Sequence, residues 1–459
     1  MAKLISVYNF AFLVIIGTYF YISKILFDRI FNTSNLIIDE EFHLPQGLLY
    51  CNFTFDTWNP KITTLPGLYL ITALVLGPVN LCTVYWLRFI NVAGSVVNLI
   101  LFNIYLNMLN PKMRWLNLLS SFNLAILPPL YFFSHLYYTD IFSVTFILLL
   151  NICSKSNNHL WASFFGVLSI LMRQTNIVWV GFSFGVYFLK TLLSLSKGDK
   201  YKYKNMDKDV AWNEIIEVGR SCILYNIWRK STFIFWTNVT AYLSVILSFL
   251  LFIYINGGIV VGDKTAHKVS LHLPQIFYFS TFCLIFAWPF FISSNNVMCF
   301  LSNIRKSRVL VFVSFLLFAL IIYYNTLEHP YLLADNRHYT FYVWNRLYRR
   351  YSWIRYIMIP VYYFGLYGLI NNLSLKCNAI FSTFYIISMF ATLVLQQMIE
   401  VRYFLIPFIY YRFHIKKIQF WQVLLEFITS IVINAAVFYI FFTKDIFWPD
   451  FEYVQKLIW

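Results

Sequence analysis

The chain has 459 residues, of which 60% are hydrophobic and 12% are charged, and its mean hydropathy is +0.66. This composition excludes a soluble globular protein, because too few polar side chains remain to cover so large an apolar core. The net charge of +16 does not indicate a nucleic-acid-binding protein, because the basic residues lie in short clusters between apolar segments. We therefore expect an all-α protein that crosses a membrane many times.

The first apolar segment, residues 4–27, follows Lys3 and lacks a cleavage site of small residues. We expect a retained membrane helix with its N-terminus in the cytosol, which places the loop at 28–81 on the lumenal side. This loop contains three consecutive carboxylates, Asp39, Glu40 and Glu41, in a chain with 19 acidic residues. They form either a functional site or an ordinary solvated loop, and spacing alone leaves both interpretations open.

The remainder of this loop predicts a helix that does not cross the membrane. Residues 65–79 are apolar but carry proline and glycine at both ends, and they are shorter than the ~20 residues of a membrane span. We expect a juxtamembrane helix at the lumenal surface. Six of the seven cysteines lie in or beside apolar spans, which leaves Cys51 without an evident partner, so we expect no disulfide framework.

The remaining apolar segments alternate across the membrane, and we expect twelve to fourteen helices in one membrane-embedded domain, residues 1–459. Further spans are predicted at 82–107, 115–133, 141–153, 159–172, 177–194, 233–256, 274–292, 309–324, 356–370, 378–397, 401–411 and 419–442. The polar insert at 195–232 has eight basic and five acidic residues, as is typical of a cytosolic loop. Arg346, Arg349, Arg350 and Arg355 oppose this pattern, so either a helix crosses between Tyr339 and Arg350 or these arginines lie on the lumenal surface.

With this topology, several polar segments lie on the same side as the acidic loop. They are Tyr138–Asp140, Arg173–Asn176, Asp263–His267, Glu328–His338 and Glu400–Arg402. Transfer of a sugar from a phosphate carrier requires a base for the accepting hydroxyl and cations for the departing phosphate. Asp39 or Glu40 is the candidate base. The candidate phosphate ligands are Arg173, Lys264, Arg337, His338 and Arg402.

Each candidate also has a purely structural interpretation. Arg173 and Arg402 can extend from a membrane helix to the interface, and Asp140 can cap the helix that follows it. His43 can orient its acidic neighbours. A metal ion at the acidic cluster is disfavoured, because three consecutive side chains cannot all point at one ion. We therefore expect no metal and no cofactor.

Taken together, the polar segments resemble the dolichyl-phosphate-glucose-dependent alpha-1,2-glucosyltransferase family of asparagine-linked glycosylation. The matching segments are Asp39–Gln46, Trp58–Gly67, Met172–Asn176, Gly257–Lys264, His267 with His272–Gln275, and His329–Tyr339. They follow one another in order along nearly the whole chain, which makes the combination far more specific than any single segment.

The resemblance implies an enzyme of the endoplasmic-reticulum membrane with the GT-C glycosyltransferase fold, lumenal juxtamembrane helices and a lumenal active site. It implies transfer with inversion from dolichyl phosphate β-glucose to the dolichyl-diphosphate-linked oligosaccharide Glc2Man9GlcNAc2. The product would be Glc3Man9GlcNAc2-PP-dolichol, the end of lipid-linked oligosaccharide assembly. The base would be Asp39 first and Glu40 second. Substrate-binding candidates are His43, Trp58, Lys61, Arg173, Asp263, Lys264, His267, Arg337, His338 and Arg402.

Two other functions fit the residues without the resemblance. A dolichyl-phosphate-mannose-dependent mannosyltransferase needs the same base and the same phosphate ligands. A membrane transporter also places polar residues among membrane helices, although its sites usually lie at the midplane rather than at one face.

Overall fold

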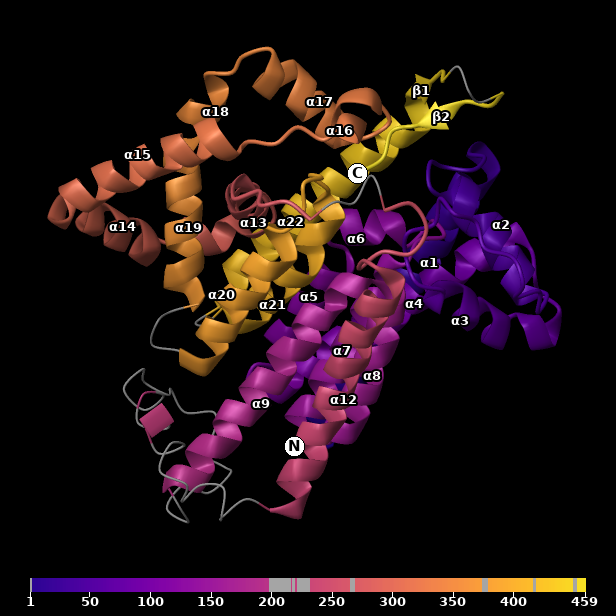
Figure 1. Cartoon of the computed structure of the whole chain (residues 1–459), viewed down its shortest axis with the longest axis horizontal. Helices are drawn as coiled ribbons and strands as arrows, with labels where there is room; N and C mark the ends of the chain where they lie inside the picture. Colours follow the sequence, from indigo (N-terminus) through magenta and orange to yellow (C-terminus); the bar gives the residue numbers. More distant parts are fainter. Residues whose placement is uncertain are drawn as a thin grey trace.

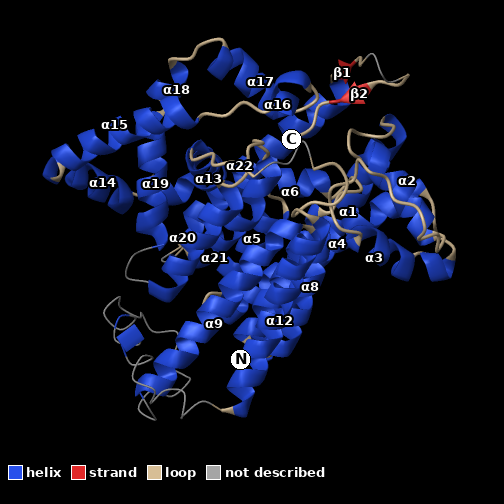
Figure 2. Ribbon diagram, viewed as in Figure 1, coloured by secondary structure: helices blue, strands red, loops and turns tan. Residues whose placement is uncertain are grey.

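The computed structural model describes residues 2–197, 216, 219–220, 232–264, 269–373, 379–415, 418–448 and 452–459. Helices make up most of the described chain, and two short antiparallel strands lie near its C-terminal end (Figure 2). The strands are β1 (Asp445–Ile446) and β2 (Gln455–Lys456).

Seven helical segments in the described part of the chain are long and apolar enough to cross a membrane. They are α1 (Ala2–Thr33), α4 (Val84–Leu109), α9 (Ile177–Lys197) with the short η2 (Gln174–Asn176) before it, α12 (Phe233–Asn256), α13 (Pro274–Phe291), α15 (Arg308–Asn325) and α22 (Phe420–Thr443). A helix suits a bilayer because it satisfies its backbone hydrogen bonds internally. The expectation of a polytopic membrane protein is confirmed, and the number of twelve to fourteen helices stays a prediction.

The remaining helices of the described chain are shorter. They are α2 (Glu40–Cys51), α3 (Gly67–Val75), η1 (Gly77–Val79), α5 (Arg114–Ala125), α6 (Pro128–Phe133), α7 (Asp140–Lys155), α8 (His159–Met172), α14 (Ser294–Lys306), α16 (Pro330–Ala334), α17 (Tyr339–Val343), the π-helical η5 (Trp344–Arg349), α18 (Ile354–Ile357), α19 (Ile359–Leu373), α20 (Ala379–Leu393), η6 (Val401–Phe404) and α21 (Leu405–His414). The predicted span at 115–133 is therefore two helices. The helix α5 ends before Pro128 and Pro129, because proline lacks a backbone N–H and restricts the conformation of the residue before it.

The two ends of the long helices carry different parts of the chain. Figure 1 shows the N-terminus of α1 and the ends of α9 and α12 that flank residues 198–231 at one end of the molecule. The helices α2 and α3 lie near the opposite end. Most of the predicted cytosolic insert, 195–232, lies outside the described residues. The acidic loop and the helix ends that border the insert are thus well separated.

The arginine-rich segment after Tyr339 does not cross the membrane. It forms α17 and η5, with five and six residues, which together are far shorter than the ~20 residues of a span. Arg346, Arg349 and Arg350 are exposed, and Arg355 pairs with Glu328 at 3.1 Å. The first of the two interpretations of this segment, a crossing helix, is therefore wrong.

A buried ion pair connects the last two helices, α21 and α22. The Arg412 guanidinium on α21 donates to both carboxylate oxygens of Glu426 on α22, at 2.7 and 2.8 Å. Glu426 also accepts a hydrogen bond from Asn123 on α5 at 2.8 Å. A charge buried in a membrane protein is costly unless it is paired, so this ion pair stabilises the packing of α21 against α22. The short helix η6 directly precedes α21 along the chain.

A disulfide corrects the expectation for the cysteines. Cys51, the last residue of α2, is bonded to Cys82, which lies two residues before α4, and 31 positions separate them in the sequence. Cys82 lies outside the span rather than within it, and the fold brings it to the end of α2. The bond ties the helix that begins beside the acids to the start of α4.

The first testable prediction concerns this disulfide. Replacing both cysteines with serine should lower the free energy of unfolding by about 3–4 kcal/mol, because the bond closes a loop of roughly 30 residues in the unfolded chain. Thermal unfolding in detergent, with and without reductant, measures the change. Reductant should lower the melting temperature of the wild type toward that of the Cys51→Ser/Cys82→Ser variant and leave the variant unchanged. Equal melting temperatures for both proteins would contradict a stabilising bond.

Candidate active site

Asp39 lies at the start of α2, where the backbone is strained. The preceding residue, Ile38, has a φ angle of 52°, in the left-handed region that a β-branched residue rarely adopts. Such strain persists only where surrounding contacts hold it, and it occurs often at functional sites. The Asp39 side chain is 41% exposed, so a substrate can reach its carboxylate.

Arg402 connects Asp39 to two other carboxylates. Its guanidinium lies 3.4 Å from the Asp39 carboxylate and 3.6 Å from that of Asp140, and it also pairs with Glu400. Arg173, at the end of α8, pairs with Asp140 at 3.1 Å. These five residues, which we call the charge cluster, come from four segments far apart in the sequence.

The arginines of the charge cluster do not extend into solvent. The side chains of Arg173 and Arg402 are 15% and 11% exposed, and both are ion-paired. Burial alone would raise the pKa of Glu400, but the positive charges of Arg402 and Arg173, together with His338, lower it. Burial alone would lower the pKa of Arg402, but the surrounding carboxylates raise it instead. Simple extension to the interface therefore does not describe these arginines. Asp140 is the first residue of α7, whose N-cap is Thr139, so the predicted capping position of Asp140 is wrong.

Glu40 adjoins Asp39 in the sequence but occupies a different environment. Its side chain is fully buried, and its two oxygens accept hydrogen bonds from Arg88 on α4 at 2.9 and 2.6 Å. The backbone N–H groups of Tyr137 and Ile37 also donate to Glu40, at 2.7 and 3.2 Å. With four donors around a buried carboxylate, little capacity remains for a substrate hydroxyl.

Sequence reasoning missed Arg88. A single arginine inside the apolar span at 82–107 was the available signal, because a charged residue within a membrane span usually has a partner and a role. Its partner could not be identified without the fold, since Glu40 lies 48 positions away.

His43 and Trp58, in the first loop, both contact Tyr69 of α3. Burial lowers the pKa of His43 to about 4, so its ring is neutral at physiological pH, and it hydrogen-bonds the Tyr69 hydroxyl. Trp58 packs against Tyr50 and Tyr69, with ring centroids 6.3 and 5.9 Å apart. A neutral His43 can hydrogen-bond a sugar hydroxyl but adds no positive charge for a phosphate.

Lys61, Asp263 and Lys264 belong to two loops that pack together. The N–H groups of Val261 and Asp263 donate to the carbonyls of Thr63 and Pro60, at 3.3 and 2.9 Å. Gly262, at a φ of 66°, makes this approach possible, because a Cβ there would lie 2.3 Å from the Pro60 carbonyl oxygen. Lys61, Asp263 and Lys264 are exposed on these loops. His267, predicted to bind substrate, lies outside the described residues.

Arg337 and His338 are held by the C-terminal segment. Arg337 donates to both oxygens of Asp335 at 2.9 and 2.8 Å and to Gln455 at 3.2 Å. His338 Nδ1–H donates to the Trp459 carbonyl at 2.9 Å. Burial would raise the pKa of Asp335, but the Arg337 hydrogen bonds together with the charges of His338 and Arg337 lower it instead. Arg337 is thus occupied by protein groups.

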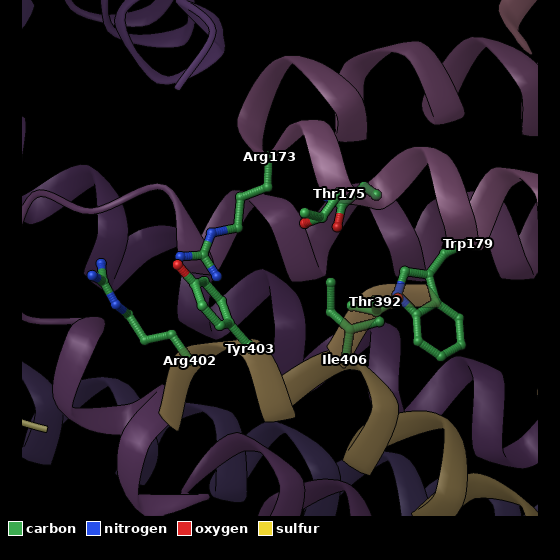
Figure 3. A pocket seen from close by; sticks show the side chains of 8 residues that line it. Arg173, Thr175, Trp179, Thr392, Arg402, Tyr403 and Ile406 are labelled. Carbon is green, nitrogen blue, oxygen red and sulfur yellow. The ribbon is translucent and has the colours of Figure 1, made fainter. Parts of the chain in front are cut away.

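A small pocket lies beside the charge cluster. Arg173, Arg402 and Tyr403 line one side of it, and Trp179 lies on the opposite side, with Thr175 between them (Figure 3). Asn176, Thr392 and Ile406 complete the lining. In the described part of the chain, no group of three or more His, Cys, Asp or Glu side chains is arranged to hold a metal ion. The site therefore combines an accessible carboxylate, two partly buried arginines and a pocket for a small group.

The comparisons with known proteins all indicate the same family. The model of the DIE2/ALG10 family matches residues 33–413. A Drosophila melanogaster protein named Dol-P-Glc:Glc(2)Man(9)GlcNAc(2)-PP-Dol alpha-1,2-glucosyltransferase is 42% identical, covering 95% of this chain and 96% of its own. Proteins of the same name from Homo sapiens and Arabidopsis thaliana are 34% and 28% identical, each covering 92% of this chain and 93% and 94% of their own. No solved structure matches the chain.

Proposed function

The chain belongs to the DIE2/ALG10 family, and on that premise we propose that it transfers glucose from dolichyl phosphate β-glucose to Glc2Man9GlcNAc2-PP-dolichol in alpha-1,2 linkage. It is a glycosyltransferase, and its named relatives cover nearly the full chain. The observation that carries the proposal is the accessible Asp39 carboxylate beside two arginines and a pocket. One base and a cationic site are what transfer from a lipid phosphate requires.

Asp39 is the general base in this proposal. Its exposed carboxylate accepts the proton of the acceptor hydroxyl as that oxygen attacks the anomeric carbon of glucose from the face opposite the phosphate. The C–O bond to phosphate breaks as the new glycosidic bond forms, which inverts the configuration. Glu40 has a positioning role instead, because Arg88 holds the first turn of α2 against α4, and the N–H groups of Ile37 and Tyr137 fix the same carboxylate.

Arg173 and Arg402 are the groups best placed to hold the donor phosphate. Both line the pocket, and both pair with carboxylates through which their orientation is fixed. Charge on the phosphate rises as it leaves, so fixed guanidinium groups stabilise the transition state more than the ground state. No metal takes part in this mechanism.

The GT-C fold with a lumenal site is part of the same proposal. In it, residues 1–459 form one membrane-embedded domain of twelve to fourteen helices in the endoplasmic reticulum, and α2 and α3 are lumenal juxtamembrane helices. The Cys51–Cys82 disulfide supports this sidedness, because disulfides persist in oxidising compartments such as the lumen. The separation of α2 from the helix ends that border the basic insert supports it as well (Figure 1).

Transfer assayed with defined substrates tests the function. Purified protein receives either dolichyl phosphate glucose or dolichyl phosphate mannose, together with the diglucosylated acceptor lipid. We expect one glucose to be added and no mannose. Mannose transfer in place of glucose would identify a mannosyltransferase, and solute counterflow in proteoliposomes without any glycosyl transfer would identify a transporter.

The second testable prediction concerns the donor phosphate. Arg173→Gln should raise the KM for dolichyl phosphate glucose by roughly 10- to 100-fold, because a hydrogen bond to a charged group contributes ~1.5–3 kcal/mol. Initial rates at varied donor and saturating acceptor measure the change. An unaltered donor KM would remove Arg173 from the phosphate site.

Arg337→Gln and His338→Gln give the comparison for that experiment. Both residues are candidate phosphate ligands from the sequence, yet both are bound to protein groups in the structure. If they contact the phosphate, the donor KM rises in these variants too. An unchanged KM in both would restrict the phosphate site to the charge cluster.

A further inference from the structure

The chain between α20 and η6 is not helical, although its sequence favours a helix. Residues 394–400 contain neither proline nor glycine, and five of the seven are leucine, glutamine, methionine or glutamate, which are good helix formers. The helix α20 nevertheless ends at Leu393, and η6 begins only at Val401. Contacts with other parts of the chain must therefore end the helix, because local preference alone would continue it.

Gln275 occupies two carbonyl groups of this non-helical stretch. Its buried side chain lies in the first turn of α13, and its Nε2 donates to the carbonyls of Gln396 and Met398, at 3.2 and 2.8 Å. Carbonyl groups outside a helix need protein partners in a membrane protein, because lipid supplies no donors. The amide of Gln275 has two N–H groups, one for each carbonyl.

His272 occupies two further carbonyl groups of the same stretch. Its backbone N–H donates to the Val394 carbonyl at 2.8 Å, and its Nδ1–H donates to the Gln397 carbonyl at 3.1 Å. Burial lowers the pKa of His272 to about 4, so the ring is neutral, and its Nε2 accepts a hydrogen bond from the Leu327 N–H at 3.4 Å. His272 thus also connects the stretch to the segment that follows α15.

We propose that His272 and Gln275 are positioning residues for Arg402. They hold residues 394–398 in a non-helical form, which fixes the start of η6 and thereby the Arg402 guanidinium beside Asp39. The inference rests on the proposed function, in which Arg402 holds the donor phosphate. Neither His272 nor Gln275 contacts the phosphate in this proposal, because both act through the backbone that leads to Arg402.

The test compares two glutamine variants. Gln275→Met keeps nearly the same shape and removes both donated hydrogen bonds. Gln422→Met makes the same change at the opposite end of α13, where the buried Gln422 amide donates to the Pro289 carbonyl at 3.1 Å. The KM for dolichyl phosphate glucose and the KM for the acceptor are measured for each. In Gln275→Met the donor KM should rise about 3- to 10-fold, as expected when a hydrogen bond to a charged group is weakened. The acceptor KM should not change, and Gln422→Met should keep both wild-type values.

An Arg402→Gln background shows whether Gln275 acts through Arg402. If it does, adding Gln275→Met to Arg402→Gln changes the donor KM no further, because residues that act through one group are not additive. The same fold-change in the wild-type and Arg402→Gln backgrounds would overturn the proposal.

His272 gives a second pair of variants. His272→Leu removes the side-chain donor and should raise the donor KM, whereas His272→Asn keeps an N–H donor close to the position of Nδ1 and should restore most of the wild-type value. Unchanged donor KM in Gln275→Met and His272→Leu would overturn the proposal. Loss of folded protein in both, with Gln422→Met still folded, would also overturn it by limiting the two residues to stability. Failure of the proposed function is distinguishable, because the wild type itself would then transfer no glucose.

Discussion

Asp39→Asn should reduce kcat by about 10²- to 10⁴-fold, the range that a positioned general base contributes. Asparagine has nearly the same shape and keeps a hydrogen-bonding oxygen near Arg402, but it cannot accept the proton of the attacking hydroxyl. The donor KM should therefore change little. Single-turnover transfer from dolichyl phosphate glucose to the diglucosylated acceptor measures the chemical step directly.

Glu41→Gln is the matched control for this variant, because it removes a neighbouring carboxylate that has no assigned role. We expect its turnover to equal that of the wild type. If Asp39→Asn retained near-normal turnover and Glu40→Gln lost it, the base would be Glu40. Equal losses in Asp39→Asn and Glu41→Gln would indicate a general electrostatic effect of the loop instead.

Arg88→Met should destabilise the folded protein by roughly 3–5 kcal/mol, because it leaves the buried Glu40 carboxylate without its partner. Thermal unfolding in detergent measures this change. Lys24→Met provides the control, since Lys24 and Asp28 form an ion pair with side chains 35% and 40% exposed. Exposed pairs contribute at most about 1 kcal/mol, so this control should melt close to the wild type.

The double variant Glu40→Gln/Arg88→Met separates stability from positioning. Removing both buried charges should recover much of the lost stability. We expect kcat to stay low while the donor KM remains near the wild-type value, because the first turn of α2 no longer has the contacts that place Asp39. Wild-type turnover in the double variant would limit the pair to a role in stability, and a stable Arg88→Met single variant would contradict the structural argument.

Much of the candidate site was predictable because its signals are local. Three acids in a chain with few acids, and arginines at the ends of apolar spans, make Asp39, Glu40, Arg173 and Arg402 candidates without any structure. The alternation of spans placed these segments on one side, and the ion pairs of Arg402 with Asp39 and of Arg173 with Asp140 bring them together. The polar loops at 58–63 and 257–264 also meet, through backbone hydrogen bonds.

Other features depended on contacts between distant segments. The sequence treats Asp39 and Glu40 almost alike, but adjacent side chains at a helix start point in directions about 100° apart. One of them therefore reaches solvent and Arg402, and the other is buried against Arg88. The Cys51–Cys82 bond was missed for the same reason, since its two residues meet only when α2 packs near α4.

By itself, the sequence determined the membrane class, the acidic first loop and, through its ordered polar segments, the resemblance to a glucosyltransferase family. These depend on composition and on short motifs, which can be recognised without knowledge of three-dimensional contacts. The tertiary structure alone decided which acid is accessible and which arginines are fixed beside it. Burial and pairing decide these roles, and both arise only when segments from 48 to 363 positions apart in the sequence pack against each other.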